Sequence, residues 1–349
     1  MTKPRIISSL LHQIDLDLKI SLNIKITNQN EDLDSYLDDL LNEITAKTQH
    51  RAYEFHRETT ESYNILLSYS KENDLSNNQS ADAFASRLLD IELKTEQRYG
   101  HLNTLGKGHV KKGSFLQFLY KKGNNLEYLG VKIEHQTFLD ETDLRKRIGL
   151  STDRKVYKAC RVTFSKGNPD EVYIYDTNTK PSVYWWQDFL ELKESRTDKY
   201  NTKQSIDEVV RVVNQLKSDY PADHTILRNS CIASFKQEGE MRYVDFVENT
   251  FKNYSPITKD LKEKLPNIIE KLLELPEKKK FDTTFNLVPS EVQYKKTKFV
   301  LTQEISLVIA EGILNLNDKV WAEKTSSGKK LVVIESAEGF ERFKLKERK

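Results

Sequence analysis

Cysteine is scarce in this chain of 349 residues, which has only Cys160 and Cys231, far apart and outside any CxxC pair. This excludes a disulfide-stapled scaffold and a cysteine-rich zinc ribbon. Long apolar runs are also lacking, since no uncharged stretch approaches the roughly 20 residues of a membrane-spanning helix. His12 and Asp15 interrupt the N-terminus before the apolar segment of a signal peptide can form. We therefore expect a cytoplasmic protein without a membrane association.

The common catalytic motifs are absent as well. The sequence has no GxxxxGK[ST] loop, no GxGxxG that opens a helix, no HExxH and no GxSxG. These absences argue against the nucleotide, hydride-transfer and serine-hydrolase classes that the motifs define, and no cofactor is expected. Net charge is also small, at +2 from 55 Lys and Arg against 53 Asp and Glu. Any attraction to nucleic acid must therefore come from local clustering of cations.

Alternation and turn residues predict an antiparallel sheet in the first half of the chain. Residues 114–120 and 126–134 are rich in strand formers and flank the turn sequence KKGNN, and residues 156–164 and 171–176 flank SKGNP in the same way. This predicts at least four antiparallel strands. Alternating apolar residues predict a further strand over 15–27, and stripes at helical spacing predict helices over 32–48 and 81–99. The aromatic stretch 184–190 predicts a short helix that packs on the sheet.

The second half reads first as helical and then as strands. Helical spacing covers residues 205–216, 222–237, 243–251 and 258–275, and Ser205 with Glu208 fits a capping box. Strand-like runs follow at 298–309, 319–324 and 330–336. We therefore predict an α+β protein with two domains. Residues 1–192 form an α+β domain with an antiparallel sheet, and residues 193–349 form a helical domain that ends in a β-hairpin region, with a polar linker over 193–204.

Basic residues gather in one segment of the sequence. Cations grouped in this way can neutralise DNA phosphates without any contact to the bases, although they also fit an ordinary solvated surface. From this clustering we predict a nucleic-acid-binding surface, and its candidate residues are Arg145, Lys146, Arg147, Arg154, Lys155, Lys158 and Arg161.

Two alternatives remain open from the residues. Asp176 ends a strand-like run and is followed by Glu191-Leu-Lys193, an arrangement similar to the D…ExK metal site of restriction-type nucleases. The second alternative is an adaptor protein, because residues 31–43 carry six acidic side chains and no basic one. A helix here could dock a partner protein through Asp34, Asp38 and Asp39.

The order of these elements resembles the bacterial nucleoid-associated protein NdpA family. The matching segments are Ile6–His12, Gly113–Tyr120, Tyr128–Leu139 and Lys155–Ala159, with looser similarity at Val172–Asp176, Tyr184–Trp185, Phe189–Leu190 and Phe281–Phe285. The resemblance implies non-catalytic association with double-stranded DNA in the nucleoid, an α+β organisation and a homodimer. It also implies a role in chromosome organisation or, with a protein partner from a multi-gene system, in defence against phage or plasmids.

Overall fold

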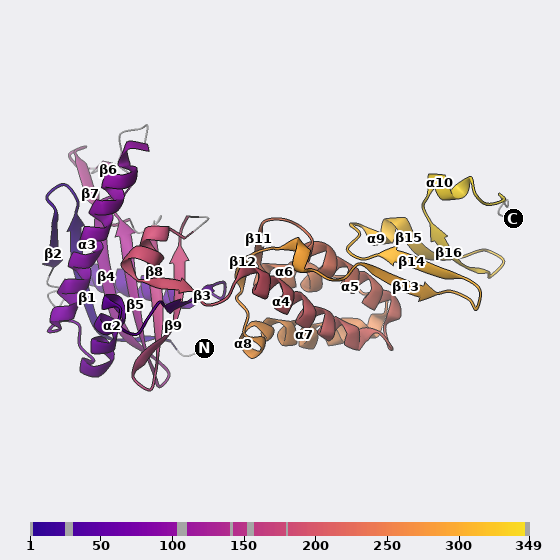
Figure 1. Cartoon of the computed structure of the whole chain (residues 1–349), viewed down its shortest axis with the longest axis horizontal. Coiled ribbons are helices and arrows are strands. Elements are labelled where there is room, and N and C mark those ends of the chain that lie inside the picture. The colour runs from indigo at the N-terminus through magenta and orange to yellow at the C-terminus, as the bar shows by residue number, and fades with distance from the viewer. Residues whose placement is uncertain are drawn as a thin grey trace. The chain divides into compact units, whose positions relative to one another are not determined.

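An eight-stranded antiparallel sheet forms the centre of the first of two structural units (Figure 1). This computed structural model describes residues 3–24, 31–102, 110–139, 142–151, 157–178 and 181–345. Unit 1 comprises Met1–Arg196 and unit 2 comprises Thr197–Lys349. The boundary expected after residue 192 lies four residues before this division, and the expected linker is instead a short strand and the start of a helix.

The sheet of unit 1 contains the two hairpins that the sequence predicts, together with four further strands. Its hairpins pair residues Lys122 with Asn125 and Ser165 with Asn168 at one end of the sheet. The strand order is β10 (Leu192–Glu194), β3 (Arg51–Phe55), β9 (Asn168–Asp176), β8 (Tyr157–Ser165), β5 (Asn125–Glu134), β4 (Gly113–Lys122), β1 (Arg5–Asp15) and β2 (Ile20–Ile24).

Helices cover both faces of this sheet, so its central strands are buried on both sides. Along β4, Phe115 and Leu119 belong to the core beneath α2 (Glu61–Glu72), α3 (Gln79–Tyr99) and the π-helical turn η2 (Tyr184–Phe189), which contributes Trp185. Leu116 and Phe118 face the opposite core, which α1 (Glu31–Thr45) covers. A strand buried on both faces is mostly apolar, as residues 115–120 are, and the one amide among them, Gln117, accepts hydrogen bonds from the hydroxyls of Tyr69 and Tyr128.

A separate two-stranded ribbon follows β5 in the chain. It pairs β6 (Gln136–Leu139) with β7 (Lys146–Gly149) and belongs to no other sheet. Its apolar side chains are exposed, since Phe138, Leu139 and Ile148 are 50%, 63% and 63% accessible. The ribbon therefore has no packed face of its own among the described residues.

Unit 2 begins with a helical core. The aromatic and aliphatic side chains at its centre include Phe235, Tyr243 and Phe251. Its helical elements are α4 (Asp198–Val213), η3 (Asn214–Leu216), α5 (Pro221–Phe235), α6 (Tyr243–Val247), η4 (Glu248–Lys252), α7 (Lys259–Leu273) and α8 (Leu275–Lys279), and a small sheet pairs β11 (Glu240–Arg242) with β12 (Thr284–Asn286).

Two hairpins complete unit 2. The second agrees with the strand-like runs 319–324 and 330–336, whereas the single run predicted over 298–309 is wrong, because the chain reverses between its two strands. Thr284–Asn286 is followed by the short 3-10 turn η5 (Pro289–Glu291) and then by the hairpins. The first hairpin pairs β13 (Lys296–Val300) with β14 (Ser306–Ala310), and the second pairs β15 (Val320–Lys324) with β16 (Lys330–Ile334). The short helices α9 (Leu316–Lys319) and α10 (Ala337–Phe340) flank the second hairpin. The α+β class is confirmed.

Two other local predictions are wrong. The continuous strand over 15–27 is a reversal between β1 and β2, because the Asp15 carboxylate accepts hydrogen bonds from the backbone N–H groups of Asp17 and Leu18, both at 3.1 Å, and this fixes a turn. Residues 25–27 lie outside the described ranges. Ser205 is not a helix cap, because α4 begins seven residues earlier, where the Thr197 hydroxyl accepts the N–H of Tyr200.

Candidate functional site

The predicted basic surface is only partly a surface. Arg145, Lys146 and Arg147 lie at the start of β7 and are exposed, with the side chains of Arg145 and Arg147 82% and 54% accessible. Among the described residues, their acidic neighbour is Asp143, at 3.8 Å from Arg145 and 3.1 Å from Arg147, and Arg147 makes a further interaction. Asp140 and Glu141 lie outside the described residues, so the described part of this end of the ribbon carries three cations and one carboxylate.

Two of the other four predicted contacts lie inside unit 1 and not on this surface. Lys158 and Arg161 lie on β8 inside unit 1, where their side chains are only 8% and 13% accessible. Arg161 is 3.8 Å from Glu127, and its guanidinium lies 4.6 Å from the ring centroid of Tyr173. The prediction that they lie on an exposed surface that contacts the DNA backbone is corrected, because both side chains face the interior of unit 1. Arg154 and Lys155 lie outside the described residues.

Lys158 belongs to a charged cavity of about 770 Å³ at the end of β5 and β8. Helix α3 and the turn η2 contribute further walls of this cavity, through Glu92 and Tyr184. At its base, Nζ of Lys132 donates hydrogen bonds to Oε2 and Oε1 of Glu92 at 2.6 and 2.8 Å. The Glu92 side chain is 0% accessible, and this burial raises the pKa of its carboxyl while Lys132 opposes the rise.

A second carboxylate in the cavity is shared between two lysines. Glu134 lies 3.5 Å from Nζ of Lys158 and 3.1 Å from Nζ of Lys111. The Tyr184 hydroxyl donates to Glu92 at 3.4 Å, and its ring lies 5.8 Å from Nζ of Lys158. The cavity thus gathers buried charges of both signs, which is the kind of environment in which binding sites are found.

The sequence contained one signal for this cavity. Glu92 falls on the apolar stripe of the predicted helix over 81–99, four residues after Leu88 and three after Leu89. A charged residue on a core-facing stripe requires a buried partner. Its partner Lys132 is 40 residues away in sequence, so the pair itself could not be read from local pattern.

The nuclease trio is divided by the fold. Asp176 ends β9 and accepts hydrogen bonds from the backbone N–H and the hydroxyl of Ser182, both at 2.9 Å. Lys193 pairs with Glu54 on β3. The β3–β9 register places Tyr53 opposite Val172, so Lys193 lies about 16 Å from Asp176 along the strand direction.

Glu191 does not bring these two residues together. Its carboxylate accepts the backbone N–H and the hydroxyl of Ser62 at the start of α2, both at 3.0 Å, and lies 3.4 Å from Arg87. Among the described residues, no three His, Cys, Asp or Glu side chains form a group that could hold a metal ion. The structure thus gives the trio no shared site.

Neither cysteine sits in a reactive setting. Cys160 and Cys231 are both buried, and burial raises the pKa of the Cys160 thiol to about 12 and the pKa of Cys231 further still. The thiolate is the nucleophilic form. Both side chains therefore act as small core residues, as the alternation around Cys160 predicts.

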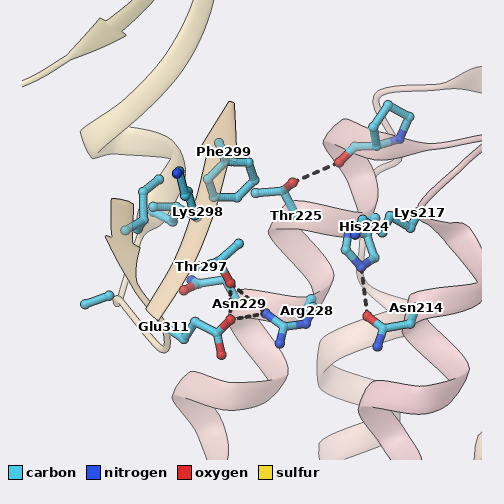
Figure 2. Close-up of a pocket in the computed structure, with 14 residues that line it drawn as sticks. Asn214, Lys217, His224, Thr225, Arg228, Asn229, Thr297, Lys298, Phe299 and Glu311 are labelled. Atoms are coloured by element: carbon cyan, nitrogen blue, oxygen red, sulfur yellow. Dashed lines mark hydrogen bonds and ion pairs between the residues drawn. The ribbon is translucent and has the colours of Figure 1, made fainter. Parts of the chain in front are cut away.

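A second cavity, of about 440 Å³, lies in unit 2 between α5 and the β13–β14 hairpin. Figure 2 shows Arg228 of α5 reaching Glu311, which also accepts a hydrogen bond from the Thr297 hydroxyl. Nearby, Asn229 accepts the N–H groups of Gly312 and Ile313 at 3.0 Å each, and His224 contacts Asn214 at 3.0 Å. Most of these polar groups use one another as partners, although Oε2 of Glu311 is buried without a hydrogen-bond partner among the described residues, and we interpret the cluster as the attachment of the hairpin to the helix.

The acidic helix is α1, and its three predicted docking residues share one property. Asp34, Asp38 and Asp39 are exposed, while Leu37 and Leu40 between them are buried against the sheet. Exposure of this kind fits a solvated helix face as well as a docking face.

Comparisons with known proteins add no family to this description. No family model matches the chain, and no curated protein matches it. None of the helices in the described ranges combines the length and apolar character that crossing a bilayer requires.

Proposed function

We propose that the protein is a non-catalytic DNA-binding protein that holds duplex DNA through its β6–β7 ribbon, with little preference for sequence. The observation that supports this most is the exposed row Arg145, Lys146 and Arg147 on a two-stranded ribbon outside the main sheet. The major groove of B-form DNA admits a two-stranded β-ribbon. Cations on its strand would then lie beside the phosphates that border the groove.

The chemistry of these side chains suits phosphates. The guanidinium groups of Arg145 and Arg147 can each offer two parallel N–H donors to a phosphate, and Lys146 adds a point charge. Affinity would come mainly from release of the counterions condensed on DNA. The exposed Phe138 on β6 can add apolar contact with thymine methyl groups or sugars without specifying a sequence.

The wider proposal follows the resemblance to the NdpA family. It adds a homodimer in the bacterial nucleoid and a role in chromosome organisation or in defence against phage or plasmids with a protein partner. Light scattering of the purified chain tests the dimer separately from DNA binding. A monomer at micromolar concentration would contradict the dimer. It would not affect the proposal that the ribbon binds DNA, which the titration below tests.

The test of DNA binding is a fluorescence anisotropy titration of duplex DNA, single-stranded DNA and RNA at several salt concentrations. The variant replaces Arg145, Lys146 and Arg147 by Ala. The matched control replaces Lys121, Lys122 and Lys166 by Ala. This removes the same charge from the hairpin turns of the eight-stranded sheet, at the end of the sheet opposite the end from which the ribbon follows β5. Folding of both variants is checked by circular dichroism.

The expected result is that the ribbon variant binds duplex DNA at least about tenfold more weakly, while the control variant binds within about twofold of the wild type. Equal losses in both variants would show a general charge effect and contradict the ribbon as the binding element. Preference for RNA over duplex DNA, or cleavage of DNA in the presence of Mg²⁺, would contradict the proposal as stated.

A further inference from the structure

The charged cavity of unit 1 contains a buried cation whose hydrogen-bonding capacity is unused. Lys158 is 6% exposed, and its ammonium carries three donor hydrogens. Among the residues that the structure describes, its only ionic partner is Glu134, at 3.5 Å, and no side chain or carbonyl accepts a hydrogen bond from Nζ. The ammonium therefore faces the cavity with free donors, which an anionic group could accept there.

The neighbouring charges do not supply that group. Lys132 donates to both oxygens of Glu92 and, at 3.4 Å, to the carbonyl of Lys111, so its three donors are occupied. Glu134 is shared between Lys158 and Lys111. Lys111 is 56% accessible and therefore lies toward the opening, so the two carboxylates face two low-exposure ammonium groups and one exposed one.

The rim of the cavity has a different chemistry. Arg98 and Tyr99 at the end of α3 are exposed, as are Asn178 and Gln187, and all four line the cavity. The two side-chain amides carry donors and acceptors, which suit the edge of a nucleobase. The Arg98 guanidinium lies 5.8 Å from the ring centroid of Tyr99, so a base at the rim would stack beside this pair. Arg98 adds a second cation near the opening.

We propose that this cavity binds a nucleoside monophosphate, with the phosphate at Lys158 and Lys111 and the base at the rim. The cavity volume of about 770 Å³ falls within the range of small-molecule sites, and its described lining carries the four cations Arg98, Lys111, Lys132 and Lys158 against the three carboxylates Glu92, Glu134 and Asp188. Lysine is a common phosphate ligand because its point charge and three rotatable donors need no fixed planar partner. This site is separate from the β6–β7 ribbon and does not depend on DNA binding there.

The experiment is isothermal titration calorimetry of the full chain with AMP, GMP, CMP and UMP in turn, then with adenosine and with inorganic phosphate. Lys158→Met removes the buried charge and keeps the length of the side chain. Arg98→Ala changes the exposed rim and leaves the core intact. Lys94→Ala is the matched control, because Lys94 is exposed on the same helix, one turn earlier, and does not line this cavity.

The expected result is saturable binding of at least one monophosphate, weakened about tenfold by Lys158→Met and about threefold by Arg98→Ala. Lys94→Ala should bind as the wild type does. The ribbon variant that lacks Arg145, Lys146 and Arg147 should also bind unchanged, so this test stays separate from that of DNA binding. If Lys158→Met does not fold, the affinities of Arg98→Ala and Lys94→Ala for the monophosphate are compared instead. Equal affinities of these two variants would contradict the proposal.

Several outcomes would overturn the proposal. No saturable binding of any of the four monophosphates is one, and equal binding by the wild type and a folded Lys158→Met is another. If adenosine binds as tightly as AMP, the phosphate does not contribute to binding. If inorganic phosphate binds as tightly as any monophosphate, the base does not contribute. Tighter binding of a single-stranded oligonucleotide with a terminal phosphate would show that the cavity holds a DNA end instead of a free nucleotide.

Discussion

Lys132 and Glu92 form an ion pair inside unit 1, with 2.6 Å between Nζ and Oε2 and with side chains that are 2% and 0% accessible. The pair joins the central strand β5 to α3. Removing one partner leaves the other charged and buried, which is far more costly than removing both. The pair is therefore the charged interaction on which the stability of unit 1 depends most.

We expect Lys132→Met to lower the free energy of unfolding by about 3–5 kcal/mol. The double variant Lys132→Met/Glu92→Leu should recover most of this loss, because no unpaired charge remains. Urea unfolding followed by far-UV circular dichroism measures both. Lys193→Ala, which breaks the exposed pair with Glu54, is the control and should cost less than about 1 kcal/mol. A double variant as unstable as the single one would contradict the account.

The attachment of the β13–β14 hairpin should depend on the guanidinium of Arg228, whose Nη1 faces both Glu311 and Thr297 and which lies 5.3 Å from the ring centroid of Tyr294. Glu311, which is 8% exposed, faces both Arg228 and Thr297. We expect Arg228→Lys to lose about 1.5–3 kcal/mol of local stability, because a lysine cannot reproduce the same donors. Hydrogen exchange of the backbone amides of residues 306–310 reports the loss directly. Lys296→Ala, an exposed change on the same hairpin, should leave that exchange unchanged.

Stability should fall in mild acid because of His50. Burial is the main cause that lowers its pKa from 6.5 to about 4, and Arg161 and Arg196 add to the effect while Glu171 opposes it. The folded state thus holds His50 neutral while the unfolded chain takes up a proton below pH 6.5. The free energy of unfolding should therefore decrease by about 3 kcal/mol between pH 6.5 and pH 4.

His50→Phe tests this, since a phenyl ring can keep the edge contact with Tyr173, whose ring centroid lies 4.5 Å away. The variant should show a flatter stability profile across that pH range. A profile as steep as that of the wild type would assign the acid sensitivity to other groups.

The salt dependence of DNA binding should report how many phosphates the ribbon residues contact. Each phosphate neutralised contributes about 0.9 to the slope of log K against log salt. If Arg145, Lys146 and Arg147 each hold one phosphate, their joint replacement should lower the slope by about 2.7. Binding isotherms at four or more salt concentrations give this number. A weaker affinity with an unchanged slope would mean that the three residues act without contacting phosphates.

The sequence pattern predicts the helices and strands whose contacts are local. The hairpin of β4 and β5 and the helices α1 and α3 follow from periodicity and turn residues, because each buries a stripe that its own residues define. Strand β3 and helix α2 were not predicted. The five residues of β3 join the sheet by pairing with β9 and β10, both more than 100 residues later, and no local pattern specifies such partners.

The candidate site also has one part that local sequence pattern predicts and one part that depends on long-range pairing. The basic cluster was visible in the sequence, but whether each cation faces solvent depends on the sheet register, which sends Lys158 into the cavity and Arg147 onto the ribbon. The alternation across β8 also puts Arg161 on the face opposite Lys158. The clustering of basic residues therefore indicated the segment that holds the candidate site. The pairing of strands in the folded chain determines which of its cations are exposed.

The strand order has a consequence for the synthesis of the chain. Strand β3 emerges from the ribosome early, yet both of its neighbours, β9 and β10, are made more than 100 residues later. Until residue 194 is available, one edge of the growing sheet stays unpaired, and closing such a large loop is slow. The hairpins β13–β14 and β15–β16 pair residues that are close in sequence and can form as soon as they emerge. Unit 1 should thus be the slow-folding part, and the part that most needs a chaperone.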